Sequence, residues 1–399
     1  MTPSSAPHVL SGSVLAAAIA GALEIEQTPD GVRPWRLPAN RRRHAPAALT
    51  LMAEFTAGVR VRLVTSASAL RVEASVARLV GAGQEAPASP APFVAVVEGA
   101  VADRVDLDRT GLVREELRSD SPDRVFERGI AVRSTVELAL GSAPGERLVE
   151  VWLPQDAAVL LHAIEADAPL RPADADPRAR WLHHGSSISH GGSADGPLGT
   201  WPARAAALLG VNGTNLGFGG NAMLDPDVAR AIGATEADVI TLKLGINLVG
   251  ADAMRRRTFL PALHGFLDLI REARPDTPIA VITAIGCPNV EETPGPIRAG
   301  SDGRATGTPR ETRIADGTLT LRATREAVAE VVAARSDDPA LHLVDGLELL
   351  SAAEGHLLPD NLHPGQEGYD LMADRFAALA RDPATPLGAA FARVLPAAS

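Results

Sequence analysis

The hydrophobic pattern of the chain changes its period near residue 180, and this change limits the fold of each part. Before it, short stretches alternate apolar and polar residues, as at 59–65, where Val59, Val61 and Leu63 share one face. After it, short apolar runs alternate with stretches of helical spacing. A chain with both patterns in succession is expected to form two domains of different class.

The first part contains alternating strands separated by Gly, Pro and Asp. In the strand at 59–65, Arg60 and Arg62 lie opposite the apolar face, which is typical of a strand buried on one side. Further strands of this kind read ALRVEASV, PFVAVVEG, STVELALG and RLVEVWLP. Many short strands without intervening helices predict an antiparallel, jelly-roll-like β-sandwich, which we place at residues 1–166.

The second part has the pattern of an α/β domain. Residues 167–180 are rich in Pro, Asp and Ala without apolar periodicity, which is typical of a linker. From 181 to 385 apolar runs and helical stretches alternate repeatedly, and residues 386–399 are expected to be a tail. This alternation predicts a parallel sheet with helices on both faces. The chemistry of such a domain lies in loops at the carboxyl ends of the strands.

The composition narrows the class of function. The chain of 399 residues carries a net charge of −11, which argues against nucleic acid or an anionic membrane surface as partner. Its one cysteine, Cys287, excludes an internal disulfide and a cysteine-based metal cluster. The apolar stretch 14–23 lacks a preceding basic residue and is too short to span a bilayer. We therefore expect a cytoplasmic protein without a membrane span.

A serine-rich loop follows the first strand of the second domain. Its sequence, HGSSISHG, places Ser187 after Gly185, which lets the chain turn sharply and expose the hydroxyl. A serine acts as a nucleophile when a base lies within hydrogen-bond reach. The segment also fits an ordinary loop between strand and helix. It lacks the G-x-S-x-G pattern of α/β-hydrolases, because Ser189 stands where the last glycine would be.

A second polar cluster follows the last strand. Asp360 and His363 are three residues apart, so one turn of chain brings the carboxylate close enough to orient the imidazole and stabilise its protonated form. In a catalytic serine–histidine pair, an aspartate orients the imidazole and stabilises its protonated form. The segment also fits a loop before a helix with an incidental histidine, and the chain has 10 histidines that compete for the role of base.

Two further loops follow the second and third strands. The glycine-rich segment NLGFGGNA, 215–222, can point backbone N–H groups at an oxyanion or at a phosphate, although the usual phosphate-binding glycine patterns are absent. The segment LGINLVG, 244–250, carries Asn247, whose amide can donate to an oxyanion or cap the following helix. With the serine and histidine segments, these loops supply the parts of an acyl-transfer site at one sheet edge.

Together the four segments resemble the blocks of the SGNH (GDSL) hydrolase superfamily. GSSIS stands where the family has G-D-S-[LI], and this resemblance makes Ser187 the nucleophile. DNLH resembles the D-x-x-H block, with Asp360 and His363. NLGFGGN resembles the second block, in which Gly220 is the oxyanion glycine and Gly219 its near competitor.

The third block, G-x-N-D, is matched by LGIN, with Asn247 as the side-chain donor. Two positions depart from the family: Ser186 replaces the aspartate before the nucleophile, and Leu248 replaces the aspartate after Asn247. Neither belongs to the triad, so the resemblance, over about residues 178–383, still implies a flavodoxin-like three-layer α/β/α fold. A sandwich before this domain resembles a two-domain bacterial subgroup whose front domain looks like a carbohydrate-binding module.

The resemblance implies a serine esterase that forms an acyl-enzyme on Ser187, with His363 as base and Asp360 as its orienting acid. It implies an oxyanion hole made of the Ser187 and Gly220 N–H groups and the Asn247 side chain, and no metal or organic cofactor. The expected substrate is a small ester, such as an acylated sugar or natural product. Two alternatives stay open: an O-acyltransferase, which has the same triad, and a non-catalytic carbohydrate-binding protein.

Other segments carry weaker indications. The Gly- and Pro-rich segment 287–317 is long for a connection between strand and helix, so it is expected to be a lid, an acceptor pocket or a solvated insertion. Trp35 and Arg36 are candidate ligand contacts in the first domain, although an isolated tryptophan more often packs in a core. The histidines near the serine loop are expected to be strand and loop residues: His183, His184 and His190.

Overall fold

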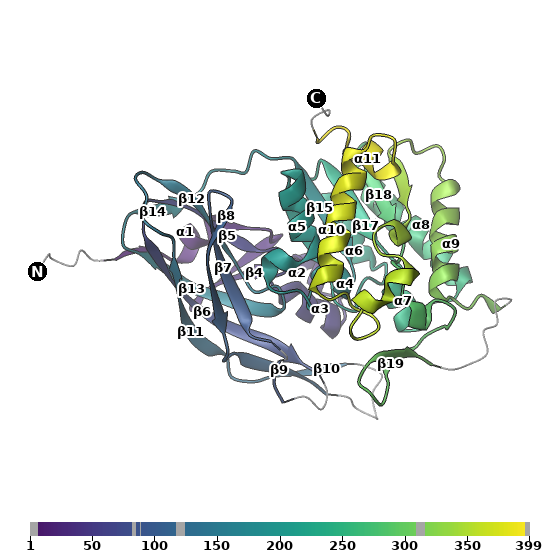
Figure 1. The fold of residues 1–399 in the computed structure, drawn as a ribbon, viewed down its shortest axis with the longest axis horizontal. Helices are drawn as coiled ribbons and strands as arrows, with labels where there is room; N and C mark the ends of the chain where they lie inside the picture. Colours follow the sequence, from purple (N-terminus) through teal and green to yellow (C-terminus); the bar gives the residue numbers. More distant parts are fainter. Residues whose placement is uncertain (1–6, 82–84, 88, 117–123, 309–315, 396–399) are drawn as a thin grey trace, which may run out of the picture. The chain divides into compact units, whose positions relative to one another are not determined.

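The structure of the protein is a computed structural model. It describes the following residues: 7–81, 85–87, 89–116, 124–308 and 316–395. The chain divides into two compact units, one of residues 1–177 with 196–198 and one of residues 178–195 with 199–399 (Figure 1). Among the described helices, none combines the length and the apolar character that crossing a membrane requires.

The first unit consists of two β-sheets. The strands of the larger sheet are β1 (His8–Leu10), β3 (Glu24–Thr28), β4 (Gly31–Trp35), β6 (Ala69–Val80), β9 (Gly111–Glu116), β10 (Val125–Arg128), β11 (Val132–Ala139) and β13 (Ala157–Ala166). The strands of the smaller sheet are β2 (Ile19–Ala20), β5 (Arg60–Thr65), β7 (Ala91–Val97), β8 (Ala100–Leu107), β12 (Arg147–Trp152) and β14 (Leu170–Pro172). The described residues of this unit also form the short helices α1 (Gly12–Ala17), α2 (Ala39–Arg42) and α3 (Ala47–Glu54).

Strand pairing and burial give this unit its architecture. The larger sheet has the order β10-β9-β6-β13-β4-β3, with β1 beside β13 and β11 beside β6, and the smaller has the order β14-β5-β12-β7-β8, with β2 beside β5. The described pairs are antiparallel except β6 with β9. Val61 and Val151 of the smaller sheet share one buried hydrophobic cluster with Val76 and Leu161 of the larger. The two sheets therefore bury a common core.

Strand β5 differs from the strand that the alternation predicts. Val61 and Leu63 are buried as expected, but Arg60 and Arg62 on the opposite face are only 2% and 9% exposed. Both guanidinium groups bond to Glu150, at 3.4 and 3.1 Å. A buried charge requires a partner of this kind, so the arginines lie in a polar but covered layer. The prediction that this strand is buried on one side is wrong.

Two segments outside the predicted domains have regular structure. Within the predicted linker 167–180, Leu170–Pro172 forms β14 and pairs antiparallel with β5. Within the predicted tail 386–399, Pro386–Phe391 forms helix α11, and Thr385 caps it by accepting a hydrogen bond from Gly388 N–H. Neither segment is long enough to show an apolar periodicity, so the sequence pattern did not predict a strand or a helix there.

The candidate ligand contacts of the first unit are core residues instead. Trp35 is 7% exposed, donates to Glu26 through its indole N–H at 2.8 Å and packs under the guanidinium of Arg42. Arg36 is fully buried and donates to the carbonyls of Phe55 and Met52. Because all these partners belong to the same unit, Trp35 and Arg36 stabilise its fold and neither side chain is available to a ligand.

The second unit is built on a five-stranded parallel sheet. Its strands are β15 (Arg180–Gly185), β16 (Asn212–Gly217), β17 (Val239–Lys243), β18 (Ile279–Ile282) and β21 (Leu341–Val344). They lie in the order β16-β15-β17-β18-β21, and every neighbouring pair is parallel. Counted along the chain this is the flavodoxin-like order 2-1-3-4-5. The parallel sheet agrees with the one predicted from the alternation of apolar runs and helical stretches.

Helices cover both faces of this sheet (Figure 1). The larger ones are α5 (Trp201–Leu209), α6 (Pro226–Ala234), α8 (Arg256–Ala273), α9 (Leu321–Ala333), α10 (Gln366–Arg381) and α11. Trp181 of β15 contacts Trp201 of α5 and Phe376 of α10, whereas His184, on the opposite face, stacks on Phe266 of α8. The three-layer α/β/α architecture after an antiparallel, sheet-rich unit confirms the predicted fold class.

Candidate active site

The order of the strands creates a topological switch point in the parallel sheet, where a ligand-binding crevice is expected. The chain order reverses between β15 and β17, so the connections that leave these neighbouring strands diverge to opposite faces. Ser187 follows β15, Gly220 follows β16 and Asn247 follows β17. All three therefore lie at the carboxyl edge, where α/β proteins bind their ligands.

Local geometry presents Ser187 at the start of a single helical turn. Helix α4 (Ser187–His190) begins after Ser186, whose hydroxyl accepts a hydrogen bond from Ile188 N–H at 3.3 Å. The turn ends at Gly191, which has the left-handed backbone (φ 81°) that glycine adopts without strain. Ser186, which replaces the aspartate of the family pattern, thus serves as the N-cap.

A chain of hydrogen bonds links the serine to the last loop of the domain. Ser187 Oγ lies 2.8 Å from His363 Nε2, and His363 Nδ1 lies 2.6 Å from Asp360 Oδ2. The other carboxylate oxygen accepts from the N–H groups of His363 and Leu362, at 2.6 and 2.9 Å. The aspartate therefore holds both the ring and its backbone turn, and it assigns the ring proton to Nδ1, leaving Nε2 as an acceptor for the serine hydroxyl.

The electrostatics of Asp360 suit this arrangement. Partial burial raises the pKa of its carboxyl, but the hydrogen bond and charge of His363 and the N–H donors of His363 and Leu362 outweigh that effect. The pKa of Asp360 falls to about 2 as a result. The group is a carboxylate at neutral pH and can stabilise a positive charge that develops on the ring.

Asn247 is oriented by the neighbouring glycine-rich loop. It lies in helix α7 (Ile246–Gly250), whose N-cap is Gly245, so the alternative of a helix-capping role for Asn247 is wrong. Its Oδ1 accepts a hydrogen bond from Ala222 N–H at 3.0 Å. Because Oδ1 faces that donor, the amide NH₂ is the group that can donate elsewhere. Gly220 lies in the same loop as Ala222 and has a left-handed backbone, φ 69°.

Comparison with known families identifies this part of the chain. The model of the GDSL-like lipase/acylhydrolase family matches residues 184–371, which include Ser187, Asn247, Asp360 and His363. Residues 184–371 are a GDSL-like lipase/acylhydrolase domain. A search of curated proteins found no matching sequence.

Several solved structures are similar to nearly the whole chain. The salicylyl-acyltransferase SsfX3 of a tetracycline biosynthetic pathway is 26% identical, with a TM-score of 0.73 over 92% of this chain and 95% of that one. A putative GDSL-like lipase from Bacteroides ovatus is 18% identical, with a TM-score of 0.68 over 94% and 98%. A family two carbohydrate esterase from Clostridium thermocellum is 15% identical, with a TM-score of 0.57 over 94% and 98%. The last two show the shared fold alone.

The long segment 287–317 of the GDSL-like domain contacts the loop that carries Asp360. Its strands β19 (Ile297–Ala299) and β20 (Ala305–Gly307) form an antiparallel hairpin. Ala305 N–H donates to the carbonyl of Asp360 at 2.8 Å, and Cys287 Sγ lies 3.1 Å from the carbonyl of Asn361. The described part of this segment therefore packs against the loop that carries Asp360 and Asn361, which we call the acid loop. Residues 309–315 of the predicted insertion lie outside the described residues.

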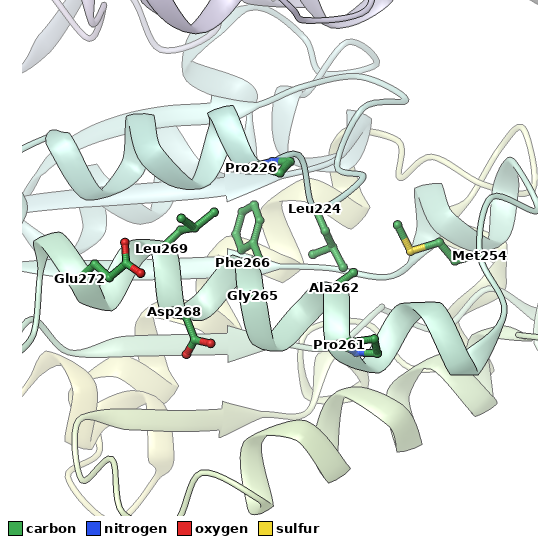
Figure 2. Close-up of a pocket in the computed structure, with 10 residues that line it drawn as sticks. All are labelled: Leu224, Pro226, Met254, Pro261, Ala262, Gly265, Phe266, Asp268, Leu269 and Glu272. Carbon is green, nitrogen blue, oxygen red and sulfur yellow. The ribbon is translucent and has the colours of Figure 1, made fainter.

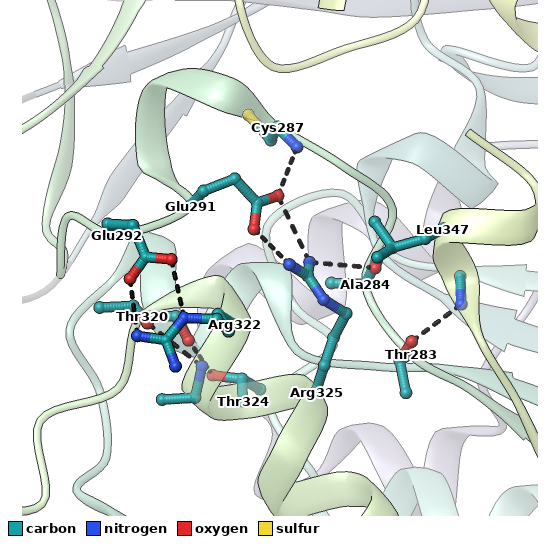
Figure 3. A network of polar contacts seen from close by, with 12 residues as sticks. Thr283, Ala284, Cys287, Glu291, Glu292, Thr320, Arg322, Thr324, Arg325 and Leu347 are labelled. Atoms are coloured by element: carbon teal, nitrogen blue, oxygen red, sulfur yellow. Dashed lines mark hydrogen bonds and ion pairs between the residues drawn. The ribbon is translucent and has the colours of Figure 1, made fainter. Parts of the chain in front are cut away.

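An ion-pair network ties the start of this segment to helix α9 (Figure 3). Glu291 bonds to the guanidinium of Arg325, and its Oε1 also accepts from Cys287 N–H at 2.8 Å. Glu292 pairs with Arg322 through two bonds of 2.7 and 2.9 Å. Arg322 and Arg325 both belong to α9, so the helix holds residues 287–292 in place beside the site.

A second serine–histidine pair is buried within the domain. His183 Nε2 is 2.7 Å from Ser189 Oγ, and its Nδ1 is 2.7 Å from Thr241 Oγ1. Ser189 is fully buried and His183 is 1% exposed, and burial holds the pKa of His183 well below its usual value. This pair fixes α4 from beneath rather than meeting a substrate. Its signal in the sequence is a histidine and a serine six residues apart, on either side of the turn at Gly185.

Proposed function

We propose that the protein is a serine esterase of the GDSL type, in which Ser187 attacks an ester carbonyl. The observation that carries this proposal is the bonded series Ser187 Oγ, His363 and Asp360, with distances of 2.8 and 2.6 Å. A serine hydroxyl becomes nucleophilic when a positioned base removes its proton, and His363 Nε2 is within reach to do so. Asp360 then stabilises the imidazolium that forms.

The first step forms a tetrahedral oxyanion. The oxyanion accepts hydrogen bonds from the N–H groups of Ser187 and Gly220 and from the Asn247 amide, whose other end is held by Ala222. Collapse of the intermediate transfers the imidazolium proton to the leaving alcohol and leaves an acyl group on Ser187. Water, deprotonated by His363, then attacks the acyl-enzyme and releases the acid.

Ser187→Ala tests the proposal directly. We expect kcat on p-nitrophenyl acetate to fall by about 10⁵-fold or more, because no nucleophile remains to form the acyl-enzyme. A fluorophosphonate probe should label the wild type at Ser187 and leave the variant unlabelled. Ser189→Ala is the matched control: its buried hydroxyl bonds to His183, so its removal should leave the labelling of Ser187 intact. Unchanged turnover in Ser187→Ala would exclude this serine as the nucleophile.

An O-acyltransferase is the second candidate. The salicylyl-acyltransferase covers nearly the whole chain at 26% identity, and a transferase uses the same triad with an alcohol in place of water. Wild-type protein acylated with p-nitrophenyl acetate would be offered alcohols of sugars and of aromatic natural products. An acetylated alcohol that forms faster than acetate supports the transferase, whereas acetate alone at every alcohol concentration supports the esterase.

A further inference from the structure

An apolar groove lies between helices α6 and α8 of the GDSL-like domain (Figure 2). Its volume is about 520 Å³, within the range of small-molecule sites. Phe266 and Leu269 of α8 line it on one side, and Leu224, in the loop before α6, and Pro226, the first residue of α6, line it on the other. An apolar lining of this kind binds hydrocarbon by removing it from water.

The two helices converge at one end of the groove. A β-carbon added at Gly233 of α6 would lie 3.1 Å from Ala273 Cβ and 3.3 Å from Leu269 O of α8. The helices are therefore in direct contact near their carboxyl ends and leave no room for a ligand there. Glu272 stands at this end, so a terminal carboxylate on a bound chain would be repelled.

The other end of the groove is formed by the loops that hold the proposed oxyanion donors. Leu224 lies four residues after Gly220, and Met254 follows α7, which carries Asn247. The hydrogen bond from Ala222 N–H to Asn247 Oδ1 joins these two loops. The open end of the groove is therefore lined by residues that follow the two loops carrying Gly220 and Asn247.

Helix α8 is locally suited to form a groove. Gly265 lies in its middle, and a β-carbon added there would meet no atom within 4 Å, so the missing side chain leaves open space on the lining. Glycine in a helix interior lowers the stability of the helix relative to alanine, so Gly265 destabilises α8 at this position. The lining segment from Pro261 to Glu272 is about 16 Å long at the helical rise, which is long enough to hold an extended medium-chain acyl group.

We propose that this groove binds the uncharged alkyl chain of the acyl group carried by Ser187. The inference rests on the proposed function, since it assigns the acyl part of the same ester substrate. The carbonyl lies at the oxyanion donors, the chain extends past Leu224 and Met254, and its end reaches Leu269. The protein therefore prefers medium-chain esters to acetate.

Gly265→Trp fills the groove without touching the triad, and Gly265→Ala is the matched control. Wild type and both variants are assayed on p-nitrophenyl acetate and p-nitrophenyl decanoate. We expect kcat/KM for decanoate to fall by about tenfold or more in the tryptophan variant alone, because the chain loses its apolar contact. Activity on acetate should stay within about twofold in all three proteins. An unchanged decanoate-to-acetate ratio in a tryptophan variant of wild-type melting temperature would overturn the proposal.

Direct binding separates this inference from the proposed function. If the wild type hydrolyses neither ester, the proposed function fails, and the groove is tested by calorimetric titration with decanol. Decanol binding that is present in the wild type and in Gly265→Ala but absent in Gly265→Trp supports the groove. No decanol binding to the wild type, or equal binding to all three proteins, overturns it.

Discussion

At the scale of single residues, Lys243 is the most unusual side chain of the GDSL-like domain. It is the last residue of β17 and is 2% exposed. Burial lowers the pKa of its ammonium to about 8, and its charge also disfavours protonation of His183. A buried ammonium costs free energy whenever it is charged, so Lys243 makes the stability of the domain depend on pH.

Lys243→Met should stabilise the protein most at neutral pH. Below pH 8 the lysine is charged in both states and the folded state bears the full cost of burial, whereas above pH 10.5 it is neutral in both. Between these values the unfolded chain binds more protons, so wild-type stability rises with pH. The variant's advantage in the free energy of unfolding should shrink by about 3 kcal/mol across this window.

Urea unfolding of both proteins at several pH values from 7 to 10.5 measures this difference. Cys287 and Tyr369, whose pKa values burial raises, titrate alike in both proteins and so cancel in the comparison. An advantage of Lys243→Met that stays constant over the window would contradict the prediction.

At the scale of elements, the hairpin β19–β20 supports the acid loop. Ala305 N–H donates to the Asp360 carbonyl, and Asn361 Nδ2 lies 3.5 Å from the Ala305 carbonyl. Asn361 itself has a left-handed backbone, φ 67°. The hairpin therefore holds a turn that is sparsely populated in the absence of support, and the orientation of the Asp360 carboxylate depends on that turn.

Replacing residues 298–306 by a short Gly-Ser link removes the support of the hairpin. We expect kcat on p-nitrophenyl acetate to fall by about 10- to 100-fold with little change in KM, because a displaced Asp360 orients His363 less well. Arg298→Ala, which keeps the hairpin and its backbone bonds, is the control. Steady-state kinetics measure both parameters, and a loss confined to KM would assign the hairpin to substrate binding instead.

At the scale of the whole molecule, each unit has its own buried apolar side chains. Leu161 belongs to the core between the two sheets of the first unit, and Leu242 lies in the parallel sheet of the second. Both are fully buried. Units with separate cores can unfold as separate cooperative blocks, so the stability of the proposed active site should follow the second core.

Leu161→Ala and Leu242→Ala form a matched pair that tests this division. Each should lower the free energy of unfolding of its own unit by about 2–5 kcal/mol, because each leaves a cavity in a packed core. Thermal inactivation, followed by the rate of fluorophosphonate labelling, should shift to lower temperature in Leu242→Ala and stay near wild type in Leu161→Ala. Equal shifts in the two variants would show that the chain unfolds as a single block.

Local sequence was enough to predict the fold class and the strands of the GDSL-like domain, because the period of apolar residues depends on near neighbours along the chain. The resemblance of four short motifs at strand ends to the SGNH blocks singled out Ser187, Asn247, Asp360 and His363, whose catalytic roles stay a prediction. The tertiary structure alone decided contacts between distant segments, and Ser187 and His363 are 176 residues apart.

Local sequence also failed to predict four other features that depend on distant contacts. These are the short strand β14, helix α11 and the burial of Arg60 and Arg62. Their burial and pairing come from partners far along the chain, as when Arg62 bonds to Glu150, 88 residues away. The hairpin on the Asp360 loop is of this kind too. Periodicity reports which face of an element is apolar, whereas packing between elements decides which polar face is covered and which loop is supported.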